Sequence, residues 1–550
     1  MSAKNVVPLL GQLRGYSVRW ARADVVTGFA VAVVLVPQAL AYGQLAGLGP
    51  AAGLYTAVGG MAVFALLSST RGVSVGPSST LAIMTFAAVS ARAGGDAGRM
   101  ASLAACLALL TGVLLLPSGR LRGLTNFLSA PVMLGYAAGT GVEVVASQVG
   151  TLVGVKTSSD RPLVRVWEVL THVDQVQLVT AGVGLAALAV LVVLKRVLPA
   201  VPGSLVVCAV AVVVSAAAGL SGHGVAVAGR VVGGLPVPAW PDVTVADVWA
   251  LLPPAAGMAM IISIEAVDAL RVADAGSREQ ASLARESLAL GVASAGAGVL
   301  GGFAPTAKDP QRGARSQLFQ LVGAGFVVFA LVTGGPVIGL LPLTVLAAVV
   351  IVSGFRLIDA AGFVRLWRGW RGECVLAFVA AVSVLALGVL QGLLVAVILA
   401  LGQLLRRTAW PRDAELAVPD DGGVPHEVAP GESASSDVLI YRVDAPLFFA
   451  NINRVHQRVL SLAAARAPYP RYVVLDAEAV FYLDSTAAEV LAQLTADLRE
   501  HGCVFVLARP RERVLAVLRA NPFRDGATRQ LRVFSSVREA YAALREPEER

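Results

Sequence analysis

The segment that decides the fold reads Ser74-Val75-Gly76-Pro77-Ser78-Ser79-Thr80, and it lies inside an apolar stretch, residues 73–91. A Gly-Pro pair followed by three hydroxyl residues predicts a broken span whose helix begins at Pro77, because proline suits the first turn of a helix. A helix that begins at membrane depth presents unpaired N–H groups and the positive end of its dipole, which suits an anion. The alternative is a loop at the membrane edge.

The composition of the chain supports a membrane location for this segment. Of the 550 residues, 56% are hydrophobic and 15% are charged, whereas a soluble domain usually carries about 25% charged residues. The charges are sparse up to about Arg407 and dense from Asp413 onward. This shift predicts a membrane domain followed by a soluble domain.

Thirteen apolar segments are candidates for membrane spans, each of which needs about 20 mostly apolar residues. They lie near residues 25–41, 52–67, 73–91, 101–116, 131–149, 176–194, 203–218, 248–264, 288–302, 318–332, 335–352, 375–387 and 389–405. A weak fourteenth segment near 303–315 makes the number of crossings even. Because arginine and lysine gather in the loops, the positive-inside rule places both termini in the cytoplasm, with the spans in the plasma membrane.

The chain therefore divides into four expected parts: a cytoplasmic N-terminal segment (1–23), a transmembrane domain (24–407), a linker (408–436) and a soluble domain (437–550). Prolines, a Gly-Gly pair and acidic residues predict the linker. In the soluble part, strand-like stretches alternate with amphipathic helical stretches, which predicts a small α/β domain.

Four further residues interrupt the apolar segments. Pro37 frees a backbone carbonyl and Gln38 adds an amide that needs a partner in lipid; the alternative for Pro37 is a simple kink. Glu265, at the end of an apolar run, is a candidate for function because ionisable groups in spans usually serve one. The alternative is that it lies at the cytoplasmic interface. For Glu143 the sequence offers no partner, and we expect it to be structural or to face the lumen without a role.

Other residue types exclude several classes of function. The four cysteines are scattered without metal-ligand spacing, and none of the five histidines lies near a plausible nucleophile or metal-ligand partner. The chain has no Walker A motif, so ATP-driven transport is not supported. It also lacks the aromatic and basic pattern of a nucleic-acid platform. We therefore expect no enzyme activity, no cofactor, no metal site and no nucleic-acid partner.

An ordered series of motifs resembles the SulP family of anion permeases, also called sulfate permeases. The motifs are Asp24-Val25-Val26-Thr27-Gly28, Val36-Pro37-Gln38-Ala39, Gly76-Pro77, Ser147-Gln148 and Arg356-Leu357-Ile358-Asp359. Each is weak alone, but together they cover nearly the whole chain in order. The soluble part is similar to the STAS domain attached to such permeases, on the runs Asp444-Ala445-Pro446-Leu447 and Leu483-Asp484-Ser485-Thr486.

The resemblance implies a polytopic α-helical membrane protein with two inverted seven-span repeats, core and gate subdomains, and a cytoplasmic STAS domain. The anion would sit near the midplane, between the broken third and tenth spans. Carried over by resemblance, the residues that bind it are Gln38, Tyr42, Gly76, Pro77, Ser78, Ser79 and Thr80. Glu265 would load a proton together with the anion, since burial of a carboxyl favours its protonated form.

The tenth span departs from the family pattern. After Phe303 a short stretch that includes a serine cluster is missing, although Thr306 still offers a hydroxyl for the anion site and Lys308 a charge. We expect a shortened or irregular span whose polar residues line a cavity or lie at the interface, because lipid does not tolerate them. The stretch contains Pro305, Lys308, Asp309, Pro310 and Arg312.

Two functions stay open on these grounds. The first is a secondary transporter of small inorganic or carboxylate anions, of the sulfate, bicarbonate or dicarboxylate class, that works by alternating access with a proton or sodium as coupling ion. The second is a transport-deficient membrane scaffold whose STAS domain is a regulatory interaction module, which the shortened tenth span favours. We also expect a homodimer in the lipid bilayer.

In the STAS part, Ser485 and Thr486 follow Asp484 at the start of a predicted helix. In related free-standing STAS proteins a partner kinase phosphorylates a hydroxyl at this place, so the resemblance implies a regulatory site. A helix N-terminus also favours added negative charge. The alternative is that Asp484 or Ser485 only caps the helix.

Overall fold

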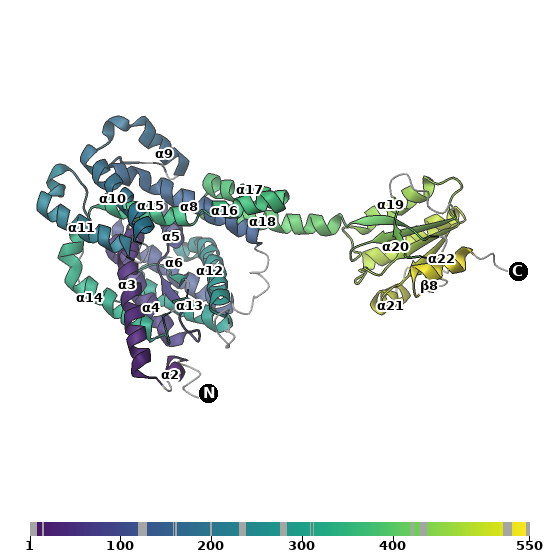
Figure 1. Cartoon of the computed structure of the whole chain (residues 1–550), viewed down its shortest axis with the longest axis horizontal. Helices are drawn as coiled ribbons and strands as arrows, with labels where there is room; N and C mark the ends of the chain where they lie inside the picture. Colours follow the sequence, from purple (N-terminus) through teal and green to yellow (C-terminus); the bar gives the residue numbers. More distant parts are fainter. Residues whose placement is uncertain are drawn as a thin grey trace. The chain divides into compact units, whose positions relative to one another are not determined.

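The computed structural model describes residues 8–13, 16–118, 129–157, 159, 162–198, 201–229, 238–274, 283–308, 310–311, 313–419, 423–428, 437–520 and 531–545. The chain forms two compact units, Met1–Ala400 and Leu401–Arg550, and each is described by itself (Figure 1). Asp309 and Arg312, two of the charges expected in the tenth span, lie outside the described residues.

The first unit is a bundle of helices with two short strands. The helices are α2 (Pro8–Gln12), α3 (Val18–Leu45), α4 (Pro50–Leu67), α5 (Ser79–Ala93), α6 (Ala97–Ser118), α8 (Ala130–Val153), α9 (Pro162–Thr171), α10 (Leu178–Val197), α11 (Gly203–Ala218), α12 (Val245–Asp274), α13 (Leu283–Val299), α14 (Leu318–Gly339), α15 (Leu343–Arg356), α16 (Ala360–Gly369), α17 (Arg371–Leu387) and α18 (Val389–Ala409); the strands are β1 (Ser74–Gly76) and β2 (Thr306–Lys308). Eight of the described helices are long and apolar enough to cross a membrane, and α5 and α11 are shorter apolar helices.

Most of the packing in this unit falls into two groups of helices, although α3 also contacts α11 and α15. One group contains α3, α4, α6, α12, α13 and α14, and the other contains α8, α10, α11, α15 and α17. The packing repeats between the two halves of the chain, since α6 packs on α13 as α4 packs on α14, and α8 packs on α17 as α10 packs on α15. These groups are the core and gate subdomains of two inverted repeats, and the predicted fold class is confirmed.

The two strands meet side by side between these repeats, at a place that is called the crossing below. β1 and β2 pair antiparallel, with Ser74 opposite Lys308, Val75 opposite Ala307 and Gly76 opposite Thr306. Their residues are buried except for Lys308, which is half-buried. Each strand belongs to the third segment of its half of the chain, so the pairing brings the predicted third and tenth spans together.

The tenth segment is irregular, as its sequence predicts. In the described part of residues 300–317, β2 is the one regular element and no helix forms before α14. The segment is instead held by Asp24 of α3, which is fully buried. Its Oδ1 accepts from the amide of Arg315 at 2.6 Å, and its Oδ2 accepts from the Ser316 hydroxyl at 2.6 Å and the Tyr16 hydroxyl at 2.8 Å.

Two buried glutamines in turn bind backbone groups of residues 70–75 in the third segment. The Gln317 amide group donates to the carbonyl of Thr70 at 2.6 Å and that of Val73 at 3.0 Å. Gln320 donates to Val73 at 3.2 Å and accepts from the amide of Val75 at 3.3 Å. Side chains thus satisfy backbone groups that have no helical partner, which the interior of a membrane protein requires.

A second buried carboxylate fixes the loop before β1. Glu286 of α13 accepts from the Ser68 hydroxyl at 2.7 Å, from the amide and hydroxyl of Ser69 at 2.8 Å, and from the amide of Thr70 at 3.1 Å. Both crossing strands are therefore anchored by an acidic side chain from a neighbouring helix.

The second unit is an α/β domain, as predicted. Its sheet has the order β4-β3-β5-β6-β7-β8, in which β5 to β8 are parallel and β3 and β4 are antiparallel. The strands are β3 (Asp413–Ala417), β4 (His426–Glu427), β5 (Val438–Val443), β6 (Tyr472–Asp476), β7 (Val504–Ala508) and β8 (Arg532–Phe534), and the helices are α19 (Ile452–Ala464), α20 (Ser485–Glu500), α21 (Glu512–Ala520) and α22 (Val537–Arg545). Apolar clusters cover both faces of the central strands, with α19 and α20 on one face and α22 on the other.

The stretch 408–436, expected to be a linker, contributes two strands to this sheet. Leu416 of β3 is buried and lies opposite Ile440 of β5, and Glu415 pairs with Arg466. One buried leucine among prolines and acidic residues is too weak a pattern to distinguish an edge strand from a linker. The strand forms because the sheet offers it a partner.

Candidate functional site

The N-terminus of α5 lies buried at the end of β1. Ser78 is the N-cap: its backbone is extended, with φ −127° and ψ 153°, and its Oγ accepts from the amide of Leu81 at 3.3 Å. Ser79 and Thr80 form the first turn, and all three hydroxyl residues are buried. The helix therefore begins at Ser79 rather than at Pro77, because the Ser78 hydroxyl takes the capping role.

Strand β2 brings a carboxylate to this place. Thr306 is buried, and its hydroxyl donates a short hydrogen bond to Oε2 of Glu265 on α12. Glu265 is half-buried. Glu265 is thereby held against the strand pair by Thr306, the residue directly opposite Gly76.

Helix α3 supplies the aromatic wall of the site. Tyr42 is buried, and the Lys308 ammonium lies 6.0 Å from the centre of its ring, a cation–π distance. The hydroxyls of Ser79 and Ser353 lie beside the Tyr42 hydroxyl. Gln38 is half-buried one helical turn earlier on the same face of α3.

The backbone at the crossing needs small and rigid residues. A Cβ at Gly76 would lie 3.0 Å from Cδ1 of Leu35 on α3, so the leucine side chain would have to shift to admit a larger residue. Pro77 is buried between this glycine and the Ser78 cap. The strand pair and its contacts thus link Gly76, Thr306, Glu265 and, through Lys308, Tyr42. Pro77, Ser78, Ser79 and Thr80 follow Gly76 along the chain, and Gln38 is placed here only by its position on α3.

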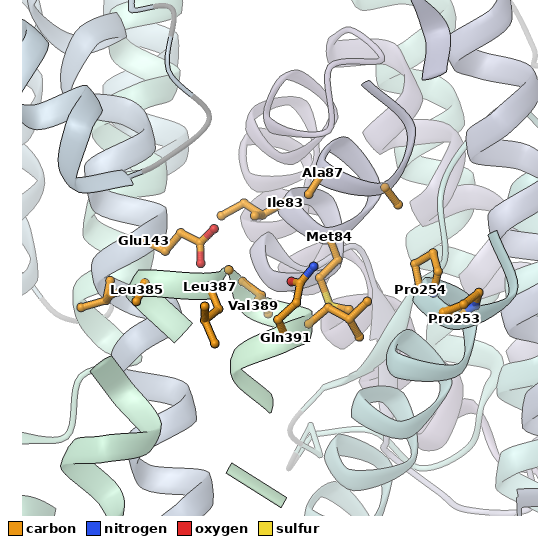
Figure 2. A pocket seen from close by; sticks show the side chains of 14 residues that line it. Ile83, Met84, Ala87, Glu143, Pro253, Pro254, Leu385, Leu387, Val389 and Gln391 are labelled. Carbon is orange, nitrogen blue, oxygen red and sulfur yellow. The ribbon is translucent and has the colours of Figure 1, made fainter. Parts of the chain in front are cut away.

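A cavity of about 590 Å³ lies beside α5 and contains a group to which the sequence assigned no role (Figure 2). Ile83 and Met84 of α5, Pro253 and Pro254 of α12, and residues 385–391 at the turn between α17 and α18 line it. Glu143 of α8 points into this cavity (Figure 2). The one signal for it in the sequence was an acid in the middle of an apolar helix.

Metal chemistry finds no support in the part of the chain that is described, where no three His, Cys, Asp or Glu side chains form a set that could hold a metal ion.

The hydroxyls Ser485 and Thr486 of the second unit lie at the surface. Asp484 is the N-cap of α20, since its Oδ1 accepts from the amide of Ala487 at 2.7 Å and its Oδ2 accepts from the amide of Phe449 at 2.9 Å. Ser485 and Thr486 are exposed. The cap is therefore Asp484 rather than Ser485, and both hydroxyls remain accessible.

Comparison with known proteins extends these observations. A family model described as the sulfate permease family matches residues 22–380, and the STAS domain model matches residues 433–540. A probable sulfate transporter of Mycobacterium tuberculosis is 37% identical over 537 residues, which cover 96% of this chain and 96% of that protein. The chloroplastic sulfate transporter 4.1 of Arabidopsis thaliana is 25% identical over 92% of this chain and 78% of its own length. These relatives are transporters, not enzymes.

Solved structures agree on the fold. The murine Slc26a9 anion transporter in the inward-facing state superposes with a TM-score of 0.88 at 18% identity, covering 98% of this chain and 94% of that one. The transmembrane domain of the cyanobacterial bicarbonate transporter BicA superposes with a TM-score of 0.59 at 22% identity, covering 70% of this chain and 98% of that domain. With its crossing strands, its core and gate groups and its family match over residues 22–380, this multi-pass membrane protein belongs to the sulfate permease family and carries a C-terminal STAS domain.

Proposed function

We propose that this protein is a secondary transporter of small anions and that the anion binds where β1 and β2 cross. One observation carries the proposal: the buried N-terminus of α5, capped by Ser78, faces the strand that bears Thr306 and Lys308. A helix N-terminus attracts an anion through its N–H groups and its dipole. The names of the relatives, which are sulfate and other anion transporters, agree with this chemistry.

The charges around the crossing suit a small anion with one or two negative charges. Lys308 adds a full positive charge to the partial positive charge of the helix end, and it lies beside Tyr42. Glu265 opposes them with a negative charge, held by the Thr306 hydroxyl. When Glu265 takes up a proton, the net charge of the site becomes more positive and anion binding is favoured. Proton and anion would then move together, which makes the transporter a symporter.

Alternating access follows from the two packing groups. The strands, α5 and α12 belong to the core side of the unit, whereas α8, α15 and α17 belong to the gate side. The proposed site therefore lies on the core side, and the gate side is the body against which it would move. A rocking movement of one body against the other would expose the anion to each side of the membrane in turn.

The setting we propose is a plasma membrane with both termini in the cytoplasm. Arg356 at the end of α15, Arg406 and Arg407 at the end of α18, and Lys195 and Arg196 at the end of α10 fit cytoplasmic loops. The proposed assembly is a homodimer.

A second candidate function rests on the irregular tenth segment. A transport-deficient scaffold with a regulatory STAS domain would need no second helix end at the crossing, and the described part of this segment has none. The intact cap at Ser78 and the charge at Lys308 favour the transporter.

Uptake into proteoliposomes separates the two functions. Full-length protein would be reconstituted and tested with radiolabelled sulfate, bicarbonate and dicarboxylates, each under an inward proton gradient, an inward sodium gradient and no gradient. We expect uptake of at least one anion that an inward proton gradient accelerates, relative to protein-free liposomes. Protein that is folded and oriented but takes up none of these anions above the protein-free level would support the scaffold.

A further inference from the structure

The carboxyl of Glu143 is a buried acid that the anion site does not use. Its side chain is 8% exposed, and its Oε2 has no hydrogen-bond partner among the described residues. It lines the cavity of about 590 Å³ shown in Figure 2. It also lines a second cavity of about 270 Å³. Glu143 thus stands between two cavities with an oxygen directed at open space.

The acid belongs to a polar stripe along one face of α8. Tyr136, Thr140, Glu143, Ser147 and Thr151 follow at helical spacing, so they lie on one side of the helix. The hydroxyls of Tyr136 and Thr140 are buried and, like Oε2 of Glu143, lack a partner in the described part of the chain. Buried polar atoms without partners are rare, and several on one helix face call for a ligand.

Helix α5 links Glu143 to the proposed anion site. Ile83 and Met84, which line the first cavity with Glu143, follow the hydroxyl residues at the N-terminus of α5 by about one turn. Glu265 is on α12 of the core group and Glu143 on α8 of the gate group. The two acids therefore lie on different packing groups.

The neighbours of Glu143 leave it only partly compensated. Arg165 of α9 lines the second cavity with it and is the one other charged residue among those that line either cavity. Arg165 also donates to the carbonyl of Ser159 at 2.6 Å. In the first cavity the lining from α5, α12 and the turn between α17 and α18 is apolar apart from Gln391. The second cavity is more polar and is also lined by Gln44, Ser90, Ser147, Gln148 and Thr151.

A buried carboxylate without a partner costs several kcal/mol when it is ionised. A sodium ion would remove this cost only with several oxygen ligands around it, because hard cations prefer oxygen. The wall of the first cavity offers mainly Ile83, Met84, Leu387 and Val389. The second cavity offers hydroxyl and amide oxygens but also the cation Arg165, and no carboxylate besides Glu143 among the described residues that line it. A proton needs no ligand cage, and the protonated carboxyl becomes a neutral hydrogen-bond donor.

We propose that Glu143 is a second proton-binding site, on the gate side of the cavity, which exchanges a proton with the cavity water as the two bodies move. The inference rests on the proposed transport function and deepens it. Glu265 would bind the proton that moves with the anion, and Glu143 would bind a second proton in the cavities beside α5. On loading, an O–H bond of a hydronium ion in the cavity breaks, an O–H bond forms on the Glu143 carboxylate, and water remains. On release, the proton passes to a water molecule on the other side and the carboxylate is restored.

The first test reads the carboxyl directly and does not depend on transport. Infrared difference spectra of the purified full-length protein in lipid nanodiscs would be recorded across a pH series for wild type, Glu143→Gln, Glu143→Asp and Glu265→Gln. Glu168→Gln is the matched control, since Glu168 lies on α9 and lines neither cavity. We expect a titrating carboxyl band that is lost in Glu143→Gln, shifted in Glu143→Asp and kept in Glu265→Gln and Glu168→Gln. Identical difference spectra for wild type and Glu143→Gln overturn the proposal.

The second test measures anion uptake by the same variants in proteoliposomes under proton and sodium gradients. Loss of proton-driven acceleration in Glu143→Gln, with uptake at no gradient retained, supports the site. Acceleration by sodium that Glu143→Gln removes overturns it in favour of a sodium site. If wild type takes up no anion, the proposed function fails, whereas the infrared result still decides whether Glu143 binds a proton.

Discussion

The third and tenth segments each contribute one short strand to the strand pair, but the chain continues differently after the two strands. Strand β1 leads into a capped helix, α5, whereas β2 leads into an irregular segment with no helix in its described part. The helix satisfies its backbone through its own hydrogen bonds, while the irregular segment relies on Asp24, which accepts from the amides of Arg315 and Ser316. An inverted repeat thus requires matching backbones only at the crossing.

The two segments also contribute different electrostatics. The third segment supplies the dipole of a helix end, which a side-chain change barely alters. The tenth segment supplies a side-chain charge at Lys308 and a hydroxyl at Thr306, each of which one substitution removes. We therefore expect the tenth segment to be the more sensitive one to mutation, in activity and in stability.

The largest effect on transport activity is expected for Lys308→Ala. Losing a charged partner of the anion should cost about 1.5–3 kcal/mol of binding, which lowers uptake on the order of 10- to 100-fold at limiting anion concentration. Initial rates of radiolabelled anion uptake measure the change. Lys195→Ala, at the exposed end of α10, is the matched control and should behave as wild type. Equal rates for Lys308→Ala and Lys195→Ala would place the anion elsewhere.

The next effect concerns stability and Asp24→Ala. Four donors lose an acceptor in a buried place, and each unsatisfied buried donor costs about 1–3 kcal/mol. We expect a clear fall in Tm of the detergent-purified protein. Asp268→Ala is the control, because Asp268 is exposed and pairs with Arg271 only at 3.6 Å. A Tm for Asp24→Ala that matches the control would show that the irregular segment does not depend on this carboxylate.

A smaller effect is expected for the third segment with Ser78→Ala. Loss of an N-cap costs about 0.5–2 kcal/mol, and the anion would also lose the Ser78 hydroxyl as a hydrogen-bond donor. We predict a higher KM with kcat nearly kept, and recovery in Ser78→Thr, which retains the hydroxyl. An unchanged KM in Ser78→Ala would separate the helix end from the anion site and weaken the comparison of the two segments.

Sequence reasoning identified the fold because its signals are local and redundant. Apolar segments mark helices, and Gly76-Pro77 with three hydroxyl residues marks the broken third segment. The tenth segment was expected to be irregular because charges and prolines cannot form a lipid-facing helix. These conclusions need only chemistry within a few residues of each other.

The rest depended on contacts between distant residues. The support of Arg315 and Ser316 by Asp24 joins positions almost 300 apart in the sequence, and no local pattern announces it. The role proposed for Glu143 depends on the cavity that α5, α12, α17 and α18 line, and these helices are distant from one another in the sequence. Strand β3 likewise exists only because β5 pairs with it.

The smallest effect is expected at the N-terminus of α20, which repeats the chemistry of α5 in a soluble domain. There Asp484 is the cap and the hydroxyls of Ser485 and Thr486 are exposed, whereas at α5 the capping Ser78 is itself buried. Thr486→Ala should therefore change stability by less than about 0.5 kcal/mol. Thr486→Glu should stabilise by about 0.3–1 kcal/mol through the helix dipole.

These two variants also test the proposal that Ser485 or Thr486 is a regulatory phosphorylation site. Added negative charge at Thr486 mimics a phosphate at a helix end that faces water, where it is tolerated at little cost. If the site is a switch, Thr486→Glu changes anion uptake or binding of a partner protein while Thr486→Ala does not, with Tm as the control for folding. If both variants match wild type in uptake and binding, Asp484 is a cap and nothing more, and the likeness between the two helix ends is confined to their hydrogen bonds.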